Sequence, residues 1–481
     1  MADTTALEEQ FLSEPARRTP IAAEVDVLVA GAGPSGYGAA LAAARMGAST
    51  LVVEKNGVPG GTSTAVLMNA WKCPVERLTG ASKEVANALI KRGAAYAGGH
   101  INFDPEALIE IELESLTAAG ARILLHTWVV EPIMADQRIR GVILQGKSGR
   151  QAVLAKAVVD ATGDGDVAYL AGAPSVKGRE EDGKMRSASS LFRVAGVDMG
   201  ALLAYCRKNP DQFHKDRARH NVSPDSQAFG IVGFYSLVEE GRRRGELPDE
   251  VHFLTFEGWD QEHGITTINS SRVYDMDGTN MWDVSRGEIE ARRQNKAIFR
   301  FMKQYVPGCK DCYVISSSSM LGVRETRRIL GEHFLTDDDM IAEKTYATSV
   351  AKLWRYINKK KGYDGHSPDG KEGAPEDADH HSTGRSLRWY ELPYGVVVPK
   401  DIDGLTVGGR IISQSREADW WTRGQYCCMI TGQIAGTAAA LAAAANTVPR
   451  NLDVSLVQRA LLQQGVDIGE AGAMYREVLS A

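Results

Sequence analysis

The chain has 481 residues, of which 43% are hydrophobic, and a formal net charge of −6. This length allows a large core and two or three domains. The acidic balance gives no sign of a nucleic-acid surface. The N-terminus has no apolar signal core, and the Ala-rich run at 434–445 is too short and weakly apolar for a membrane span. We therefore expect a cytoplasmic protein that binds neither nucleic acid nor membrane.

The six cysteines form no pattern typical of a disulfide framework. Cys309 and Cys312 have CxxC spacing, but the second half of a zinc site is missing, and the pair does not open a helix after a strand. We expect reduced thiols and no metal ion, while a redox role of Cys309 and Cys312 stays open.

The segment 25–54 is the most informative part of the chain. An apolar run ends at Gly31-x-Gly33-x-x-Gly36, and an alanine-rich helix and a second apolar run ending at Glu54 follow. This is the layout of a dinucleotide-binding βαβ unit. Gly31 allows the tight turn, Gly33 lets the backbone approach a pyrophosphate, and Gly36 lets helix and strand pack closely. Glu54 can accept hydrogen bonds from an adenosine ribose, and its charge disfavours the 2′-phosphate of NADP.

The next elements continue an α/β pattern. After a loop rich in Gly, Thr and Ser, an amphipathic helix is predicted over 104–119, and β-like stretches follow at 122–130, 141–144 and 153–160. The last stretch runs into a Gly/Asp turn at 161–166. An apolar strand that ends in such a turn suits a second strand end facing a cofactor.

The composition changes near residue 180, and the cofactor-domain pattern returns near residue 396. Between them lies a mixed region with a polar segment at 359–381, which we interpret as a surface loop. Short strands are then predicted at 396–399 and 405–407, a glycine turn at 408–412 and a helix over 424–445. The predicted domains are a polar arm (1–22), the first part of the cofactor domain (23–180), an inserted substrate domain (181–395), the second part (396–450) and a helical tail (451–481).

Four segments, taken in order, resemble one family. They are VAGAGPSGYGAALAAARMG with VVEK, VVDATGDGDVA, GVRETRRILGEHFLTDDD, and ELPYGVVVPKDIDGLTVGGRIIS. They are similar to the FAD-dependent oxidoreductases related to the flavoprotein group of succinate dehydrogenase and fumarate reductase. The resemblance implies an α/β fold, with a discontinuous Rossmann-like FAD-binding domain and an inserted mixed α+β substrate domain. Because this scaffold supports many reactions, it does not identify the substrate.

The resemblance also implies which residues hold FAD. They are Gly31, Gly33, Ser35, Gly36, Glu54, Lys55, Gly61, Thr62, Val129, Ala161, Gly163, Asp164, Gly409, Arg410, Arg423 and Gln425. Arg423 to Gln425 would face the pyrimidine edge of the flavin, where negative charge gathers on reduction. Some relatives attach FAD covalently through a His after the paired glycines. Here Gly60 and Gly61 are followed by Thr and Ser, so we infer non-covalent FAD.

Arg324, Arg327 and Arg328 form the first cluster of candidates for catalysis. On a helix, Arg324 and Arg328 would share a face and clamp a carboxylate, since guanidinium groups suit bidentate anion binding. The alternative is ion pairing with Glu325 and Glu332. We assign Arg324 as catalytic and Arg328 as substrate-binding.

Five further side chains complete the predicted site. His366, which the resemblance places in the pocket, and Tyr394, a donor to a substrate oxygen, are the other catalytic candidates. Asn269, Arg272 and Trp421 are the other substrate-binding candidates. The alternatives are a solvated loop for His366, a strand end for Asn269 and Arg272, and core packing for Trp421. Gly395 follows Tyr394 where relatives often have an Arg, which removes a cation.

The leading hypothesis is a dehydrogenase or oxidase that transfers a hydride between a small organic substrate and flavin N5. The electron acceptor is not identified, and a homo-oligomer stays open. One alternative is a fumarate-reductase-like ene reductase with an Arg as proton donor. Another is an electron-relay or RNA-associated flavoprotein, which the acidic balance disfavours.

Overall fold

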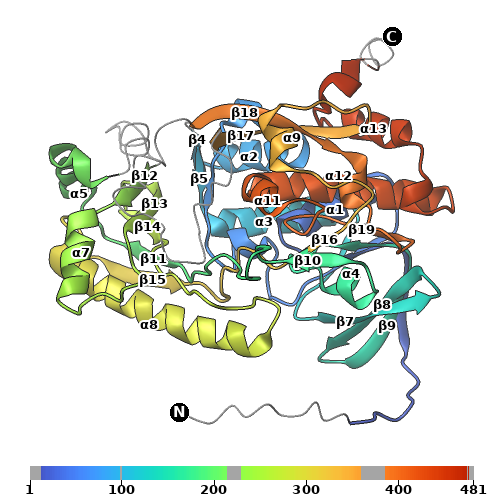
Figure 1. Cartoon of the computed structure of the whole chain (residues 1–481), viewed down its shortest axis with the longest axis horizontal. Helices are drawn as coiled ribbons and strands as arrows, with labels where there is room; N and C mark the ends of the chain where they lie inside the picture. The colour runs from blue at the N-terminus through green and yellow to red at the C-terminus, as the bar shows by residue number, and fades with distance from the viewer. Residues whose placement is uncertain (1–11, 98–99, 214–228, 359–384, 474, 476–481) are drawn as a thin grey trace.

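The computed structural model describes residues 12–97, 100–213, 229–358, 385–473 and 475. A mixed sheet runs through the larger unit in the order β6-β2-β1-β9-β8-β7, with β19 also paired to β9 (Figure 1). Pairing is parallel from β6 to β9 and between β9 and β19, and antiparallel among β7, β8 and β9. The strands are β1 (Ile21–Ala30), β2 (Thr50–Val53), β6 (Arg122–Leu124), β7 (Trp128–Ala135), β8 (Arg138–Gly146), β9 (Gly149–Asp160) and β19 (Leu405–Val407).

The centre of this sheet brings the predicted cofactor strands together. In β1, Val29 lies beside Val52 of β2 and Val159 of β9. All three side chains are fully buried, as expected for parallel strands covered on both faces. Since β1, β2 and β9 run in the same direction, their carboxyl ends meet at one edge of the sheet, where ligands bind in α/β folds.

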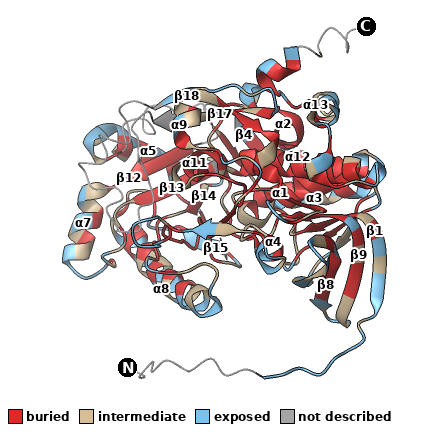
Figure 2. Cartoon of the chain, turned by 45° about the vertical axis from the view of Figure 1, so that its right-hand side comes forward, coloured by how far each residue is buried: buried red, intermediate tan, exposed pale blue. Residues whose placement is uncertain are grey.

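Helices α1 (Pro34–Arg45) and α12 (Gln425–Ala444) cross at backbone contact (Figure 2). A Cβ added at Gly432 would lie 1.8 Å from Ser35 O, and one added at Gly436 would lie 2.1 Å from Ala39 O. Only glycine fits such a contact. Because Gly432 and Gly436 meet Ser35 and Ala39 in the same order, the two helices run parallel, and their N-termini lie at the same side of the sheet.

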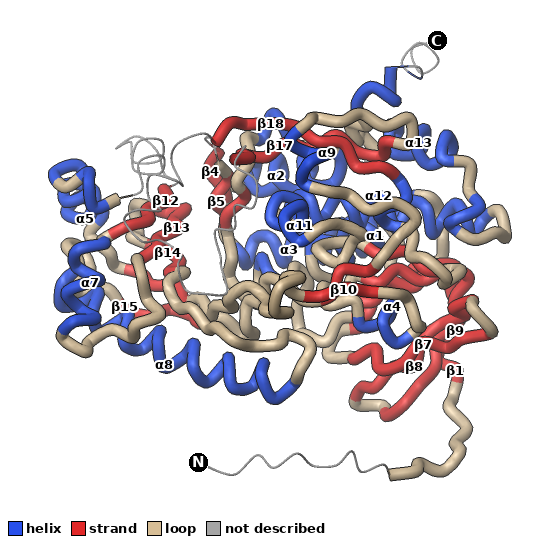
Figure 3. Tube along the Cα trace, viewed as in Figure 1, coloured by secondary structure: helices blue, strands red, loops and turns tan. Residues whose placement is uncertain are grey.

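A second antiparallel sheet forms the inserted unit, in the order β12-β13-β14-β11-β15 (Figure 3). It has its own buried core, drawn from residues between Phe192 and Cys312. Its strands and helices are β11 (Phe192–Ala195), α5 (Met199–Lys208), β12 (Phe229–Gly233), α7 (Tyr235–Arg243), β13 (Leu254–Asp260), β14 (Ile265–Ile268), α8 (Met281–Tyr305) and β15 (Tyr313–Ser317).

The remaining elements join the two units or cover the main core. Buried residues from Ile329 to Tyr394 belong to the main core, although they fall within the predicted inserted domain 181–395. Core membership does not define where one domain ends and the next begins, so the predicted boundaries stay a prediction. These elements are β3 (Ala70–Trp71), α2 (Gly80–Lys91), β4 (Ala95–Ala97), β5 (Ile101–Phe103), α3 (Pro105–Ala118), α4 (Asp166–Leu170), β10 (Ser175–Lys177), β16 (Arg327–Ile329), α9 (Asp337–Ile341), β17 (Ser349–Asn358), β18 (Arg385–Pro393), α11 (Arg416–Thr422) and α13 (Val454–Gln463).

The structure confirms the predicted α/β elements of segment 25–160 and corrects two others. The helix expected across Arg324 and Arg328 is wrong, because Arg327 and Arg328 lie in strand β16, which pairs with β10. The strand expected at 396–399 is also wrong, because Tyr394–Val397 is a 3₁₀ helix. Both segments are short, so long-range pairing decides their conformation more than local pattern does.

Helix α12 corrects the expectation that the C-terminal apolar run is too short to span a membrane. Within the described chain it is one helix whose length and composition would suffice, and 89% of its most apolar window is buried inside the protein. A helix that is apolar on all sides is typical of a core position as well as of a membrane span. Its contact with α1 shows that α12 is a core helix here.

A buried carboxyl group lies in helix α3. Glu112 has no solvent exposure, and neither of its carboxylate oxygens has a hydrogen-bond partner in the structure. Burial raises the pKa of Glu112 well above its usual value, with a smaller contribution from the charge of Glu54. The group is therefore neutral in the folded protein over a pH range where it ionises in the unfolded chain.

Replacing Glu112 with Gln should increase stability above pH 4.5. The unfolded carboxyl ionises near pH 4.5, so below that pH wild type and the Glu112→Gln variant should differ little in their pH dependence. As pH rises towards the pKa that Glu112 has in the folded protein, the unfolding free energy of wild type should fall by about 1.4 kcal/mol per pH unit relative to that of the variant. Urea unfolding at pH 5 and pH 7 measures this, with Glu110→Gln on the exposed face as the control. An equal difference at both pH values would contradict it.

Candidate functional site

A cavity of about 790 Å³ lies at the carboxyl edge of the main sheet and extends to the inserted sheet. This volume falls within the roughly 300–1,000 Å³ typical of small-molecule sites. Its wall runs from Glu54 and Trp128, past the glycine turn at Gly31, to Arg272 and Arg324.

The glycine turn and the start of α1 form the middle of the cavity. Gly31 has a φ of 95°, and a Cβ there would lie 2.5 Å from Ala161 O. Gly33 is the N-cap of α1, so the first N–H groups and the positive end of the helix dipole face the cavity. The buried Ser35 Oγ lines the same wall and has no hydrogen-bond partner. These are the features of a phosphate-binding helix N-terminus.

Glu54 and Trp128 lie at one end of the cavity. Glu54 accepts hydrogen bonds from Ala32 N and Asn56 N, both at 2.8 Å, and so ties the end of β2 to the glycine turn. The Lys55 ammonium lies 5.2 Å from the Trp128 ring, a cation–π contact beside Val129. This end offers an aromatic face and a carboxylate, which suit an adenosine.

A pair of opposite charges, Asp164 and Arg410, lies on the wall of the middle part of the cavity. Arg410 Nη2 donates to Asp164 Oδ1 at 2.5 Å, and Gly163 lies against the Arg410 guanidinium. Gly409 N donates to Thr431 Oγ1 at 2.8 Å, which fixes this turn to α12. Two chain segments that are far apart in sequence therefore meet at the wall of the cavity.

The N-terminus of α12 reaches the cavity beyond this point. The side-chain amide of Gln425 is hydrogen-bonded to neighbouring residues. Its Oε1 accepts hydrogen bonds from Trp71 Nε1 (2.7 Å) and Ser63 Oγ (2.9 Å). Its Nε2 donates a hydrogen bond to Met68 O (2.7 Å). The side chain therefore fastens the loop after η1 (Gly61–Ser63) to the helix start. The helix N-terminus itself remains the positive end of a dipole.

The predicted cofactor residues share one location. Apart from Gly36, all of them line the cavity; whether each contacts FAD stays a prediction. The lining residues are Gly31, Gly33, Ser35, Glu54, Lys55, Gly61, Thr62, Val129, Ala161, Gly163, Asp164, Gly409, Arg410, Arg423 and Gln425. Gly36 packs on the turn instead, where an added Cβ would lie 1.8 Å from Gly31 O.

Two arginines meet at one hydroxyl group in the outer half of the cavity. Arg324 Nη2 donates to Ser189 Oγ at 2.8 Å, and Arg272 Nη1 donates to the same oxygen at 3.2 Å. Arg272 also donates to Ser271 O at 2.8 Å. The arginines are 9% and 3% exposed and line the cavity, as do Asn269 and Trp421. Two convergent guanidinium groups create a strongly positive position suited to a carboxylate.

Two other predicted residues, Tyr394 and Arg328, do not line this cavity. Tyr394 donates its hydroxyl to Pro449 O at 2.8 Å, and Arg328 donates to Glu325 Oε1 at 2.8 Å and to Gly178 O. Neither belongs to the cavity wall, so we withdraw their catalytic and substrate-binding assignments. His366 lies outside the described residues, in the segment 359–384.

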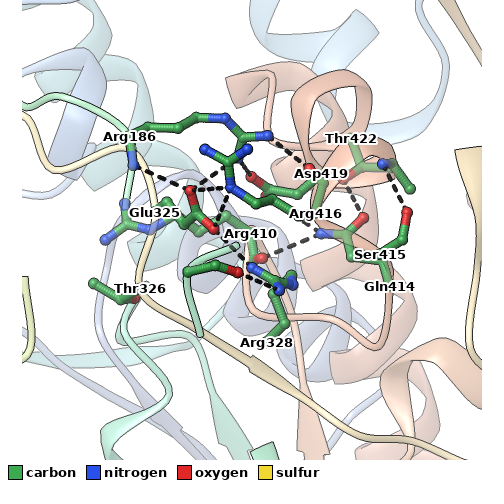
Figure 4. A network of polar contacts seen from close by, with 12 residues as sticks. Arg186, Glu325, Thr326, Arg328, Arg410, Gln414, Ser415, Arg416, Asp419 and Thr422 are labelled. Carbon is green, nitrogen blue, oxygen red and sulfur yellow. Dashed lines mark hydrogen bonds and ion pairs between the residues drawn. The ribbon is translucent and has the colours of Figure 1, made fainter. Parts of the chain in front are cut away.

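Arg328 belongs to a buried ion network instead (Figure 4). Glu325 accepts from Arg328, from Arg416 and from Arg186 N, and Arg186 also pairs with Asp419 at 2.5 Å. Burial raises the pKa of Asp419, while Arg186 and Arg423 act in the opposite direction. This network joins the segment before β16 to α11, so the Arg-rich motif is largely structural.

The sequence interpretation missed several cavity residues. Lys72 pairs with Glu257 at 2.7 Å across the two units, and His100 packs edge-on against Tyr356 with ring centroids 5.7 Å apart. Arg355 also lines the cavity. These residues stand in separate short segments with no motif. Alternation along residues 254–260 would place Thr255 and Glu257 on one face, which is the one signal available for Glu257.

The cysteines occupy buried positions. All six are free thiols, and Cys309 and Cys312 lie in the core of the inserted unit. Among the residues that the structure describes, no group of three His, Cys, Asp or Glu side chains is arranged to hold a metal ion.

Comparison with known proteins agrees with the cofactor cavity. The family model of FAD dependent oxidoreductases matches residues 26–461. The chain is 30% identical over 156 residues to digeranylgeranylglycerophospholipid reductase of Methanosphaerula palustris and 31% identical over 155 residues to thiamine thiazole synthase of Methanococcus vannielii. Each match spans 29% of this chain, and 39% and 56% of the respective relative.

A solved structure of a geranylgeranyl bacteriochlorophyll reductase-like protein from Thermoplasma acidophilum is similar over 95% of this chain and 99% of its own, at 14% identity and a TM-score of 0.44. The narrower relationship to the succinate dehydrogenase and fumarate reductase group stays a prediction. Since the family model spans most of the chain, the protein belongs to the family of FAD-dependent oxidoreductases and is an enzyme with FAD as its cofactor.

Proposed function

We propose that this enzyme transfers a hydride between a small organic anion and N5 of a non-covalently held FAD. The observation that carries the proposal is the continuity of one cavity, which joins the glycine turn at Gly31 to the arginine pair Arg272 and Arg324. A cofactor in the inner part and a substrate anion in the outer part would then share one water-excluding space.

The inner part supplies what FAD requires. The start of α1 and Ser35 would hold the pyrophosphate, and Glu54 and Val129 would hold the adenosine. Thr62 and Ser63 follow the paired glycines, where a covalent attachment would need a nucleophile such as His. This supports non-covalent binding.

The outer part supplies charges for the substrate. Arg272 and Arg324 would bind an oxyanion in two-pronged fashion, and Ser189, which receives hydrogen bonds from both, fixes their orientation. When bound, FAD supplies an acceptor for the electron pair of a substrate C–H bond. We assign the accompanying proton to Glu257 at Oε2, while Oε1 keeps its ion pair with Lys72.

The same cavity suits the alternative, an ene reductase that uses an Arg as proton donor. Arg324 supports this less well, because it donates to Ser187 O at 2.5 Å as well as to Ser189 and is held as an anion clamp. Anaerobic bleaching of the holoenzyme with alcohols, amines and acids, followed by reoxidation with oxygen, quinone or fumarate, separates the two. Bleaching by an alcohol or an amine supports dehydrogenation, whereas fast reoxidation by fumarate without bleaching by alcohols supports the alternative.

Membership of an oxidoreductase family supports an enzyme over the electron-relay or RNA-associated flavoprotein. We propose no lipid substrate from the name of the reductase relative, because the match covers only 29% of this chain and 39% of that relative. The small-molecule substrate, the electron acceptor, the cytoplasmic location and a homo-oligomer all stay predictions.

A substitution at the glycine turn tests the cofactor position. The Gly31→Ala variant should lose most of its bound FAD, because the new Cβ would lie 2.5 Å from Ala161 O. Gly47→Ala is the matched control. Gly47 has a similar positive φ of 83° but nothing within 4 Å of its Cβ, so it should lose only about 1–2 kcal/mol of stability and keep FAD. Flavin absorbance relative to protein absorbance measures both. Equal flavin content in the two variants would contradict the proposed position.

A second substitution tests the anion clamp. Arg324→Ala should retain FAD but slow flavin bleaching by the substrate about 10- to 100-fold, the effect of losing a charged hydrogen bond. Arg324→Lys should recover part of the rate, and Arg300→Ala on the exposed face of α8 should behave as wild type. Anaerobic stopped-flow absorbance gives the rates. Unchanged bleaching in Arg324→Ala would show that Arg324 is structural.

A further inference from the structure

We propose that Arg355, together with the N-terminus of α12, stabilises the negative charge that FAD gains when it is reduced. This inference rests on the proposed function only for the orientation of the cofactor, with its redox ring towards α12. It assigns a role to a residue that no local motif marks.

The guanidinium of Arg355 lies at the N-cap of that helix. Gly424 is the N-cap of α12, and a Cβ added there would lie 2.2 Å from Arg355 Nη1. Both residues line the cavity. The positive end of a 20-residue helix and a positively charged side chain therefore lie side by side at one point of the cavity wall.

Among the residues that the structure describes, no acid forms an ion pair with Arg355, and no carboxylate lies within 4.0 Å of its guanidinium. The groups that face it are Tyr390, Tyr426 and Cys427, and burial raises the pKa of each of them. They are neutral at ordinary pH. An Arg keeps its proton in proteins, so this position holds a net positive charge.

The surrounding hairpin holds Arg355 in place. Tyr426, the second residue of α12, donates its hydroxyl to Trp354 O at 3.1 Å, and Tyr390 of β18 donates to Cys427 Sγ at 3.2 Å. Arg77 stacks on the Trp354 ring with its Cζ 4.2 Å from the centroid. Strand β17 is thus fastened to α12 at the residues that flank Arg355. A preorganised charge stabilises developing negative charge without rearrangement.

The position suits an anion, and two sources are available: the reduced cofactor and the carboxylate of the substrate. We favour the cofactor, because a separate arginine pair, Arg272 and Arg324, stands at Ser189 in the outer half of the cavity. Reduced flavin gathers negative charge at one edge of its ring, and protein charges near that edge tune its electronics.

The test uses the FAD-loaded enzyme without substrate. Sulfite adds to oxidised flavin and leaves a negative charge on the ring, so its dissociation constant reports the same electrostatic stabilisation. In Arg355→Met this constant should rise at least about tenfold, and the midpoint potential of the flavin should fall. Arg355→Lys should recover most of both. Arg388→Met is the control: Arg388 pairs with Arg355 in the hairpin register, but its guanidinium binds Glu343 at 2.9 Å.

Two outcomes would overturn the proposal. If sulfite affinity and potential match wild type in Arg355→Met while KM for an anionic substrate rises, Arg355 serves the substrate. If sulfite affinity, midpoint potential and KM all match wild type, Arg355 serves neither the cofactor nor the substrate. Should Arg355→Met fail to retain FAD, Arg355→Gln and Arg355→Lys carry the comparison. Because sulfite and potential need no substrate, failure of the hydride-transfer proposal would leave these results interpretable.

Discussion

The arrangement of the cofactor cavity depends on the backbone contact between α1 and α12. The glycines of α12 leave no side chain between the helices, and an added Cβ at Gly432 would collide with Ser35 O at 1.8 Å. Because the two helices run parallel, both N-termini open at the carboxyl edge of the sheet. In the proposed position of FAD, one N-terminus would face the pyrophosphate and the other the redox ring. Two helix dipoles would then act on one ligand, which a looser crossing would not allow.

Apolar packing and charge both act between distant segments of the chain. Val66, Leu67 and Leu191 form a small buried apolar cluster, and a buried ion network joins the segment before β16 to α11. The Glu325 carboxylate forms ion pairs with Arg186, Arg328 and Arg416. Arg186 forms a second ion pair with Asp419 on α11. Removing one partner from such a buried network leaves an uncompensated charge at a cost of about 3–5 kcal/mol. Each member therefore holds the others in position. Arg324, the neighbour of Glu325, is directed by this network towards Ser189 and the cavity.

Local pattern selected cofactor candidates that line one cavity, but it missed several residues in the other half of that cavity. The turn at Gly31 and the acid Glu54 belong to one βαβ unit whose spacing is dictated by a pyrophosphate and a ribose. Arg355, Lys72 and Glu257 come from segments that meet only after the inserted sheet has folded against the main unit. Tyr394 and Arg328 show the reverse error. Their residue types suit catalysis, but the Tyr394 hydroxyl donates to Pro449 O and the Arg328 guanidinium pairs with the Glu325 carboxylate.

The sequence by itself determined the dinucleotide unit, because this depends on contacts within about thirty residues and on glycines that no other residue replaces. It also determined the family and hence the cofactor, through motifs spread along the chain. Only the tertiary structure decided which arginines face the cavity. Arg324, Arg328 and Arg355 carry the same functional group and differ in their partners. Arg328 pairs with Glu325, three residues away, as the alternative interpretation of the sequence had it. The partners of the other two lie far away along the chain, so spacing in the sequence carries no record of them: Arg324 shares the Ser189 hydroxyl with Arg272, and Arg355 lies at Gly424, the N-cap of α12.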